Sequence, residues 1–195
     1  MSDIGIFLDR DGTINEELEY ISNPDKVILI PGSADAIREA NMLGLKVFVI
    51  SNQSGVARGF VKEDELVLVN NRLVELLNEK NAHLDAIYFC PHHPEYGEPP
   101  YRMFCDCRKP SAGMLKQAEA EFSIDLKKSF VIGDRIVDIL TAIPVGAKSI
   151  LVLTGYGKNE YERVKSENIS VDYIAKDLFD AMQFVKKSLN QIQNK

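Results

Sequence analysis

The sequence predicts an α/β fold built on an open, doubly wound parallel sheet, and three observations lead to this prediction. Short apolar runs alternate along the chain with longer segments of helical periodicity. Most of these runs lack alternating polar residues, as is typical of parallel strands buried on both faces. The chain has 195 residues, a length that suits one domain. We therefore expect a single domain over residues 1–195.

The strand candidates follow one another in a regular order. The runs are short, and most are rich in Val, Ile and Phe, residues that favour strands. The strong candidates are Ile4–Leu8, Lys46–Ile50, Ala86–Phe89, Phe130–Ile132 and Ser149–Leu153. Val171–Ile174 is a weaker candidate, which we expect to form an edge strand.

Helical periodicity fills much of the chain between these runs. Ser33–Leu43 follows Pro31-Gly32 and stops at Gly44, which are residues typical of helix ends. A last helix is expected to begin after Asp177, a plausible N-cap. Apolar residues recur at helical spacing at Leu66, Val69, Leu73, Leu76 and Leu77, at Met114, Leu115, Ala118 and Phe122, and at Leu178, Met182, Val185 and Leu189.

Composition excludes several classes of partner. There are 23 Lys and Arg residues and 29 Asp and Glu residues, so the formal net charge is −6. A mildly acidic chain is a poor general binder of nucleic acid or of anionic membranes. No apolar run approaches the roughly 18 residues needed to span a bilayer, and the N-terminus shows no signal-peptide pattern. We expect a cytoplasmic protein and, in the absence of a long exposed apolar helix, a monomer.

Carboxylates and a hydroxyl follow three of the predicted strands. Asp9 and Asp11 come after the first run, Ser51 after the second and Asp134 after a later one. Because ligands bind outside the carboxyl ends of such strands, we expect these side chains to meet at one edge. Oxygen ligands of this kind suit magnesium, and an aspartate can act as a nucleophile beside a second, acid–base carboxylate. The alternative is a simple solvated turn at Asp11-Gly12.

Four motifs carry a family resemblance. Phe7–Asn15, which contains Asp9-Arg10-Asp11-Gly12-Thr13, resembles the first motif of the haloacid dehalogenase superfamily. Ser51-Asn52 resembles the second motif, Lys109 the third and Gly133–Asp138 the fourth. The motifs occur in the family's order. The resemblance implies the Rossmann-like fold of that superfamily, and the short segments between the motifs leave no room for a separate cap domain.

The resemblance also implies a role for each matching residue. Asp9 would be the nucleophile and a magnesium ligand, and Asp11 the general acid and base, with its backbone carbonyl also on the metal. Ser51 and Lys109 would hold the phosphoryl oxygens, and Asp134 would complete the magnesium site. Asp138 either orients loop groups or is an exposed helix residue.

The cysteines form a second cluster of candidate ligands. All 3 cysteines, with two of the 3 histidines, fall within residues 90–107, a proline-rich segment that we expect to be a loop. Cys90, His92, Cys105 and Cys107 would suit a closed, tetrahedral structural zinc site, with His93 as the competing fourth ligand. The alternative is three buried free thiols beside a chance histidine pair. The loop ends directly at Arg108-Lys109, so a metal here would fix the backbone that orients two cations.

Two related subfamilies share this zinc loop, namely the D-glycero-D-manno-heptose 1,7-bisphosphate 7-phosphatases and the histidinol-phosphate phosphatases. Ser51–Gly59, Cys90–Pro94 and Cys105–Pro110 are similar to the first subfamily. That resemblance implies magnesium-dependent removal of the 7-phosphate through an aspartyl-phosphate, in the biosynthesis of nucleotide-activated heptose for lipopolysaccharide. It leaves open the sugar anomer, and hence an ADP- or a GDP-heptose pathway. Two alternatives are a phosphatase of histidinol phosphate or another small monoester, and a catalytically silent zinc-stapled binding module.

Expected substrate contacts come from the same segments. Arg58 and Arg108 look like a clamp for the distal part of a sugar phosphate. Arg135 stands where the family often has lysine. Glu17-Leu18-Glu19 departs from the family's Asp-His-Gly before Tyr20, which leaves its contact with the sugar open. The candidate substrate-binding residues are Tyr20, Asn52, Gln53, Ser54, Arg58, Arg108 and Arg135.

Overall fold

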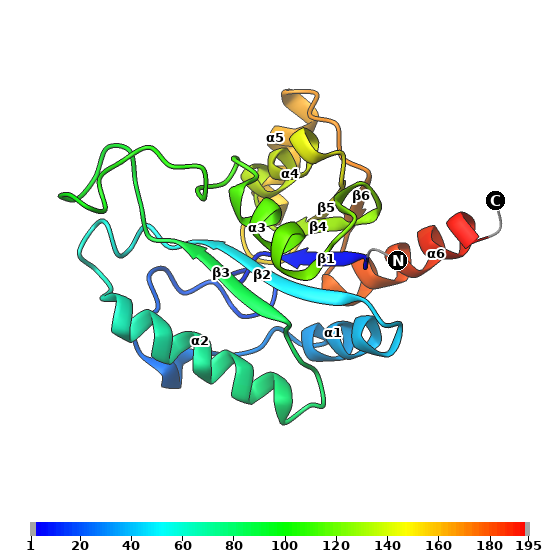
Figure 1. Ribbon diagram of the computed structural model, residues 1–195, viewed down its shortest axis with the longest axis horizontal. Coiled ribbons are helices and arrows are strands. Elements are labelled where there is room, and N and C mark those ends of the chain that lie inside the picture. Colours follow the sequence, from blue (N-terminus) through cyan, green and yellow to red (C-terminus); the bar gives the residue numbers. More distant parts are fainter. Residues whose placement is uncertain (1–2, 194–195) are drawn as a thin grey trace.

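A computed structural model describes residues 3–193, and its strands form one six-stranded parallel sheet of order β3-β2-β1-β4-β5-β6 (Figure 1). This arrangement confirms the predicted fold class. The weak sixth run is indeed the edge strand, shifted by one or two residues. The strands are β1 (Gly5–Leu8), β2 (Lys46–Asn52), β3 (Ala86–Cys90), β4 (Phe130–Gly133), β5 (Lys148–Val152) and β6 (Tyr173–Ala175).

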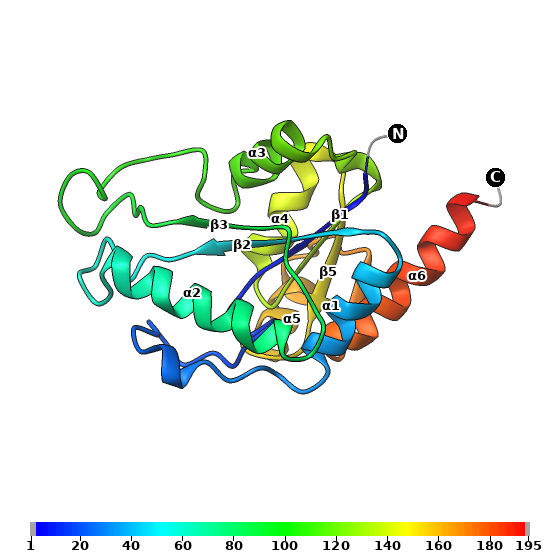
Figure 2. The same cartoon turned by 60° about the horizontal axis from the view of Figure 1, so that its bottom comes forward.

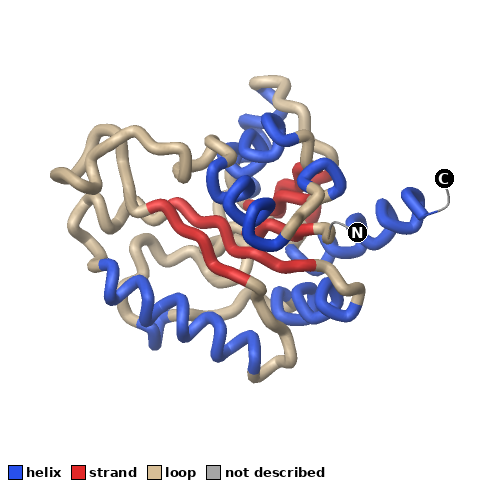
Figure 3. Tube along the Cα trace, in the orientation of Figure 1, coloured by secondary structure: helices blue, strands red, loops and turns tan. Residues whose placement is uncertain are grey.

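Helices cover both faces of the sheet (Figure 3). The buried residues of α1, α2 and α6 form one core with one face of the strands, and those of α3 and α4 form another with the opposite face. Among the described residues, no helix combines the length and the apolar character needed to cross a membrane. The helices are α1 (Ser33–Met42), α2 (Glu63–Asn78), α3 (Gly113–Phe122), α4 (Ile136–Ala142), α5 (Gly157–Ser166) and α6 (Leu178–Gln193), with short 3-10 turns at η1 (Pro24–Lys26), η2 (Leu126–Lys128) and η3 (Ile143–Val145).

The central strand β1 shows why the runs lack polar alternation. Successive side chains of a strand point to opposite faces. Ile6 and Leu8 belong to the core beneath α1, α2 and α6, whereas Phe7 stacks on Phe48 in the opposite core, with ring centroids 5.1 Å apart. All four residues of β1 are buried, so no position of the strand carries a polar side chain.

The strand order fixes where a ligand can bind. The chain runs outward from β1 through β2 to β3 and then crosses to β4 on the other side of β1. β1 and β4 are therefore neighbours whose following loops diverge, which opens a crevice at their carboxyl ends. Asp9 follows β1 and Asp134 follows β4, so both lie at this crevice.

The loop after β3 is the least regular part of the described chain. Residues 91–112 contain no helix or strand and are joined internally by an isolated bridge between His93 and Arg102. Figure 2 shows this loop projecting beyond the end where β2 and β3 finish. The segments between β1 and β4 otherwise hold only η1, α1, α2, α3, η2 and two strands, so the expected absence of a cap domain is confirmed.

Two helices went unrecognised in the sequence, α4 and α5. The sequence of α4, Ile-Val-Asp-Ile-Leu-Thr-Ala, is rich in β-branched residues, which hide helical periodicity in so short an element. The helix α5 is mostly polar and packs through Tyr161 and Val164, one turn apart. Each helix forms because tertiary packing on β4 and β5 outweighs weak local propensity.

Candidate active site and cysteine cluster

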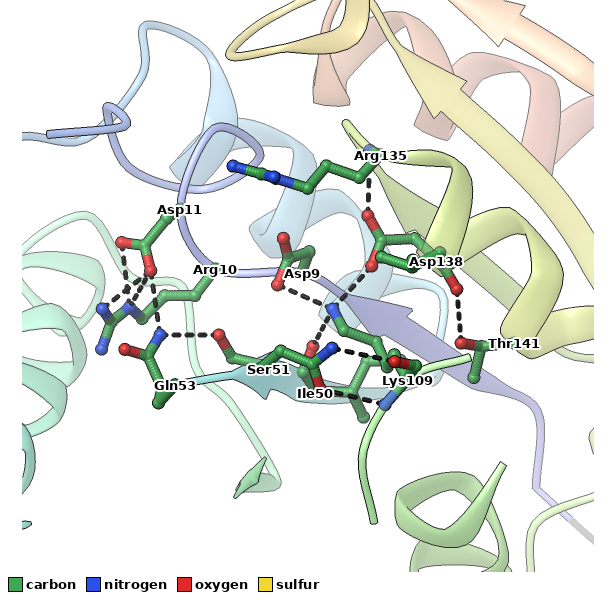
Figure 4. A network of polar contacts seen from close by, with 12 residues as sticks. Asp9, Arg10, Asp11, Ile50, Ser51, Gln53, Lys109, Arg135, Asp138 and Thr141 are labelled. Atoms are coloured by element: carbon green, nitrogen blue, oxygen red, sulfur yellow. Dashed lines mark hydrogen bonds and ion pairs between the residues drawn. The ribbon is translucent and has the colours of Figure 1, made fainter. Parts of the chain in front are cut away.

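Lys109 lies at the centre of a buried network of polar contacts (Figure 4). Its Nζ is 2.8 Å from Asp9 Oδ1 and 2.6 Å from Asp138 Oδ1, and it donates a 2.7 Å hydrogen bond to the Ile50 carbonyl. Lys109 is only 3% exposed. Burial would lower the pKa of Lys109, but the Asp138 and Asp9 carboxylates outweigh it and raise that pKa. The side chain is therefore a fixed cation.

Two carboxylates contact this cation and a third, Asp134, lies beside them, which creates an excess of negative charge. Ligand oxygens of Asp9, Asp134 and Asp138 all lie within 4.8 Å of one another. Asp134 Oδ2 accepts a 2.7 Å hydrogen bond from the Tyr156 backbone, while its buried Oδ1 has no hydrogen-bond partner among the described residues. Burial, with the charges of Asp9 and Asp138, raises the pKa of Asp134. An orphaned carboxylate oxygen in an all-oxygen, negatively charged cluster fits a hard divalent cation.

Asp138 is buried, so the alternative of an exposed helix residue is wrong. Its Oδ2 accepts a hydrogen bond from the Arg135 backbone at 3.0 Å, which caps the first turn of α4. Burial raises the pKa of Asp138 to about 6, although the charge of Lys109 acts in the opposite direction. Asp138 therefore ties the loop after β4 to Lys109.

Two glycines let the backbone approach Asp134 closely. Gly12 has a φ of +80°, and a Cβ placed on it would run into the Asp134 carboxylate. A Cβ on Gly155 would meet the same carboxylate. Thr154 Oγ1 donates a 2.6 Å hydrogen bond to the Gly12 carbonyl and holds the two loops together. The loops after β1 and β5 thus enclose the Asp134 carboxylate, and only glycine at positions 12 and 155 leaves room for it.

The Asp11 carboxylate turns away from this cluster (Figure 4). Arg10 contacts it through Nη2 at 2.8 Å and through Nε at 3.1 Å, and amide nitrogens of Asn15 and Gln53 each donate at 2.9 Å. Burial alone would raise the pKa of Asp11, but the charge and hydrogen bonds of Arg10, with the two amides, hold it below its usual value. Asp11 is thus an oriented carboxylate beside, and separate from, the lysine network.

The residues at the end of β2 connect these two groups. Gln53 donates hydrogen bonds to Ser51 Oγ at 2.8 Å and to Asp11. The Asn52 side chain donates to the Lys109 carbonyl at 3.0 Å and accepts from the Lys109 backbone nitrogen at 2.9 Å. Asn52, expected as a substrate contact, therefore also fixes the backbone of Lys109.

A cavity of about 590 Å³ opens above these groups. Its size is that of a small-molecule site. Asp9, Asp11, Ser51 and Lys109 line its floor, and Glu17 and Glu19 line it from the segment after β1. Every expected substrate-binding residue lines the same cavity, namely Tyr20, Asn52, Gln53, Ser54, Arg58, Arg108 and Arg135.

Three of the four arginines that line this cavity each contact a neighbouring ring or carbonyl group. The guanidinium of Arg58 lies 3.7 Å from the ring centroid of Tyr96. Arg108 donates a 3.0 Å hydrogen bond from Nη1 to the His92 carbonyl. Arg135 lies 3.9 Å from the ring centroid of Tyr156, within 3.8 Å of a carboxylate oxygen of Glu17. The cavity therefore carries pre-positioned positive charge at its rim.

The expected sulfur cluster is present in the loop. Cys105 Sγ lies 3.5 Å from Cys90 Sγ and 3.3 Å from Cys107 Sγ, and His92 Nδ1 lies 3.7 Å from Cys90 Sγ and 3.4 Å from Cys107 Sγ. All four ligand atoms lie within 4.8 Å of one another, close enough to hold one metal ion. All three cysteines are free thiols. Burial raises the pKa of Cys90 and of Cys107, which disfavours thiolates unless a cation is bound.

His93, the competing fourth ligand, is used elsewhere. Its Nδ1 accepts hydrogen bonds from the backbone nitrogens of Glu95 at 3.1 Å and Tyr96 at 3.3 Å, and it lies outside the ligand cluster. Within the described chain, His92 completes the cluster.

Sequence reasoning missed two buried residues behind Asp11. Arg10, inside the first motif, is 1% exposed and makes the contacts to Asp11 described above. Asn70 on α2 accepts a 2.8 Å hydrogen bond from Arg10 Nη1. One signal was available for Asn70, because it is a polar residue between Val69 and Leu73 on the apolar face of α2.

The known proteins that resemble this chain are HAD-like hydrolases and heptose bisphosphate phosphatases. Residues 106–181 match the family model for HAD-hydrolase-like proteins. The chain is 41% identical over 183 residues to the D-glycero-D-manno-heptose-1,7-bisphosphate 7-phosphatase of Chlorobaculum tepidum, covering 91% of each chain. It is 38% identical over 190 residues to the D-glycero-beta-D-manno-heptose-1,7-bisphosphate 7-phosphatase of Escherichia coli K12, covering 96% of each chain.

Solved structures agree with these relatives. The D,D-heptose 1,7-bisphosphate phosphatase of B. bronchiseptica, in complex with magnesium and phosphate, superposes with a TM-score of 0.82 at 29% identity, over 94% of this chain and 98% of that one. The corresponding phosphatase of Burkholderia thailandensis has a TM-score of 0.67 at 27% identity, over 93% and 97%. On this identity and coverage, the chain is a phosphoric monoester hydrolase that belongs to the D-glycero-D-manno-heptose-1,7-bisphosphate 7-phosphatase family of HAD-like hydrolases.

Proposed function

We propose that this enzyme hydrolyses D-glycero-D-manno-heptose 1,7-bisphosphate to the 1-phosphate and inorganic phosphate. The observation that carries the proposal is the Lys109–Asp9 pair at the floor of a cavity that Arg58, Arg108 and Arg135 also line. A bisphosphate needs one site that reacts with a phosphoryl group and a second cationic site that only binds one. The names of the relatives support the same substrate.

Magnesium is the cation that the carboxylate cluster fits. Asp9 and Asp134 would hold it through their carboxylates, and Asp11 through its backbone carbonyl. The orphaned Oδ1 of Asp134 and the excess negative charge support this assignment. The ion would supply neutralisation of charge on the transferring phosphoryl group. A relative solved with magnesium and phosphate supports it further.

In the first step, the Asp9 carboxylate attacks the phosphorus of the 7-phosphate. The bond between phosphorus and the C7 oxygen breaks, and Asp11 in its acid form gives a proton to that oxygen. Lys109 and Ser51 hold the phosphoryl oxygens during the transfer. The products of this step are heptose 1-phosphate and a phosphoryl group on Asp9.

In the second step, water attacks the phosphorus of the aspartyl-phosphate. Asp11, now an anion, takes a proton from this water, and the bond between phosphorus and the Asp9 oxygen breaks. Inorganic phosphate leaves and both aspartates return to their starting states. Arg10, Asn15 and Gln53 hold the Asp11 carboxylate in one orientation, which supports its role in moving this proton.

The arginines of the rim would bind the phosphate that stays. Arg58 and Arg108 would contact the anomeric phosphate, with Arg135 and Tyr20 beside the sugar. A charge-assisted hydrogen bond is worth roughly 1.5–3 kcal/mol. That corresponds to about ten- to a hundred-and-fifty-fold in catalytic efficiency. We therefore expect a bisphosphate to be preferred over a monophosphate.

Zinc is the metal that we propose for the sulfur cluster. Thiolates about 2.3 Å from a tetrahedral zinc lie about 3.8 Å apart, close to the sulfur spacings of this cluster. The zinc would be structural, because its four ligands close the coordination sphere. Its effect on the reaction would pass through Arg108, whose hydrogen bond reaches the carbonyl of the ligand His92. Reduced thiolates favour a cytoplasmic setting.

The names of several relatives support one anomer of the substrate. Several of them, including the Escherichia coli enzyme, are named for the beta anomer. We propose the same anomer here, with its product entering the ADP-heptose branch of nucleotide-activated heptose biosynthesis. Histidinol phosphate is the second candidate substrate, because its phosphatases share the zinc loop.

A panel of phosphate esters tests the proposal. It contains both anomers of heptose 1,7-bisphosphate, heptose 7-phosphate, histidinol phosphate and 4-nitrophenyl phosphate, each assayed with magnesium for kcat/KM. We expect the beta bisphosphate to exceed the 7-phosphate by about ten- to a hundred-and-fifty-fold. Faster turnover of histidinol phosphate than of either bisphosphate would replace the proposed substrate.

A further inference from the structure

A polar residue of α2 reaches the site from the interior of the protein. Asn70 is 7% exposed and lies on the helix face that also buries Leu66 and Leu73. An amide on such a face costs free energy unless it is hydrogen-bonded. Its Oδ1 accepts a 2.8 Å hydrogen bond from Nη1 of Arg10, 60 residues away in the sequence. The helix α2 is thereby connected to the loop that follows β1.

Arg10 transmits this contact to Asp11. All three guanidinium nitrogens are used, because Nη1 contacts Asn70 while Nε and Nη2 contact the Asp11 carboxylate. Arg10 is 1% exposed, so solvent does not compete for these donors. The guanidinium is planar and rigid, and holding one nitrogen therefore orients the other two. The position of Asn70 sets the position of the Arg10 donors.

Two amide side chains also hold the carboxylate of Asp11. Gln53 and Asn15 each donate to it at 2.9 Å, and Gln53 also donates to Ser51 at 2.8 Å. Figure 4 shows the Asp11 carboxylate in contact with Arg10 and Gln53, and Gln53 in contact with Ser51. The orientation of Asp11 relative to the reacting centre thus depends on its neighbours rather than on any contact with Asp9.

We propose that Asn70 is a positioning residue, which through Arg10 fixes the Asp11 carboxylate for proton transfer to the leaving oxygen. This inference rests on the proposed function, in which Asp11 is the acid of the first step and the base of the second. Asn70 lines neither the cavity nor the carboxylate cluster. Its removal should leave the attack by Asp9 intact and impair only the steps that need a proton moved by Asp11.

Leaving-group dependence separates this role from a structural one. An alkoxide such as the C7 oxygen of heptose needs a proton to leave, whereas 4-nitrophenolate leaves without one. We expect Asn70→Leu to lower the first-turnover rate of heptose bisphosphate cleavage by about ten- to a hundredfold, a fraction of what general acid catalysis supplies. Release of the first equivalent of 4-nitrophenol should fall less than about threefold, followed by a slower steady state because water also needs the base. Rapid-quench and stopped-flow measurements give both rates.

Three controls keep the result interpretable. Asn70→Asp retains an oxygen acceptor for Arg10 and should restore the wild-type ratio of the two rates. Val69→Ala removes a buried apolar group beside Asn70, and should lower the melting temperature without changing that ratio. Asn70→Ala replaces Asn70→Leu if the leucine variant does not fold.

The outcomes are distinct. An unchanged ratio in Asn70→Leu or Asn70→Ala, whether both rates fall equally or neither falls, overturns the proposal. Failure of the proposed function has another signature, namely turnover that survives Asp9→Asn. Loss of activity in Asp9→Asn with an unchanged ratio at Asn70 would reject the role of Asn70 alone.

Discussion

The two candidate metal centres are built in opposite ways. The carboxylate centre takes Asp9 and Asp134 from the ends of neighbouring strands, and the sheet holds both in place. The sulfur cluster takes all its ligands from β3 and the irregular loop that follows it. Hydrogen bonds of a sheet fix strand ends, whereas a loop without strands or helices needs a cross-link. The comparison teaches that only the first centre should carry chemistry, while the second should hold a segment of chain.

Residues of the two centres lie within a few positions of each other along the chain. Cys107 belongs to the cluster and Lys109, two positions later, to the reaction centre. Between them, Arg108 contacts the carbonyl of His92. Asn52 then brackets the Lys109 backbone from the end of β2. The sheet and the cluster thus each hold one end of a short segment that carries two cations.

Asp9→Asn tests whether the carboxylate centre carries the chemistry, and it has the largest expected effect. An amide is nearly the same size but cannot act as the nucleophile. We expect kcat to fall by at least about 10⁴-fold, as for the loss of other catalytic nucleophiles. The circular dichroism spectrum and zinc content should match the wild type. Near-normal turnover would remove Asp9 from the role of nucleophile.

Chelation should separate the two metals. A short exposure to EDTA should abolish turnover, and added magnesium should restore it, because few protein ligands hold that ion. Zinc should stay bound, since thiolates and an imidazole hold it far more tightly. Elemental analysis before and after the treatment provides the check. Loss of zinc in parallel with activity would contradict the division of roles.

Cys107→Ser tests the holding role of the cluster. It should lose zinc and destabilise the protein by about 2–5 kcal/mol, a typical effect of losing a structural cross-link. Activity should fall with stability, because Arg108 and Lys109 lose one of their supports. Met103→Ser, on the same loop but outside the cluster, is the matched control and should keep zinc, melting temperature and turnover. A zinc-free Cys107→Ser protein of unchanged stability would reject the structural zinc.

Arg108→Ala tests the role of the residue that lies between the two centres in the sequence. It should lower kcat/KM for heptose bisphosphate by about ten- to a hundred-and-fifty-fold, the worth of one charge-assisted hydrogen bond. Hydrolysis of 4-nitrophenyl phosphate should change much less. Equal losses on the two substrates would assign Arg108 to the transferring phosphoryl group instead.

The sequence alone predicted the sheet and one of its edges well. Buried parallel strands are continuous apolar runs, and the residues after them gather at one edge, which is why Asp9, Ser51 and Asp134 could be grouped before any coordinates. Lys109 and the sulfur ligands came from motif resemblance and spacing. Roles of individual site residues and the monomeric state stay predictions.

The missed features depend on contacts between distant segments. Asn70 acts on a residue 60 positions away, and nothing in the local pattern of α2 names its partner. The choice of His92 over His93 depends on how the loop turns, because His93 Nδ1 is taken by backbone donors two and three residues later. The burial of Asp138 depends on Lys109, which arrives from another loop. Such features follow from tertiary packing rather than from local sequence.

The most direct test of the proposed function is the identity of the phosphate that leaves. Phosphorus NMR can follow heptose 1,7-bisphosphate during incubation with the enzyme and magnesium, because the anomeric and the C7 phosphates give separate signals. We predict that the C7 signal disappears while inorganic phosphate appears, and that the anomeric signal persists to the end of the reaction. Early loss of the anomeric signal, or loss of both signals at equal rates, would contradict the proposed binding of the anomeric phosphate by the arginines of the rim.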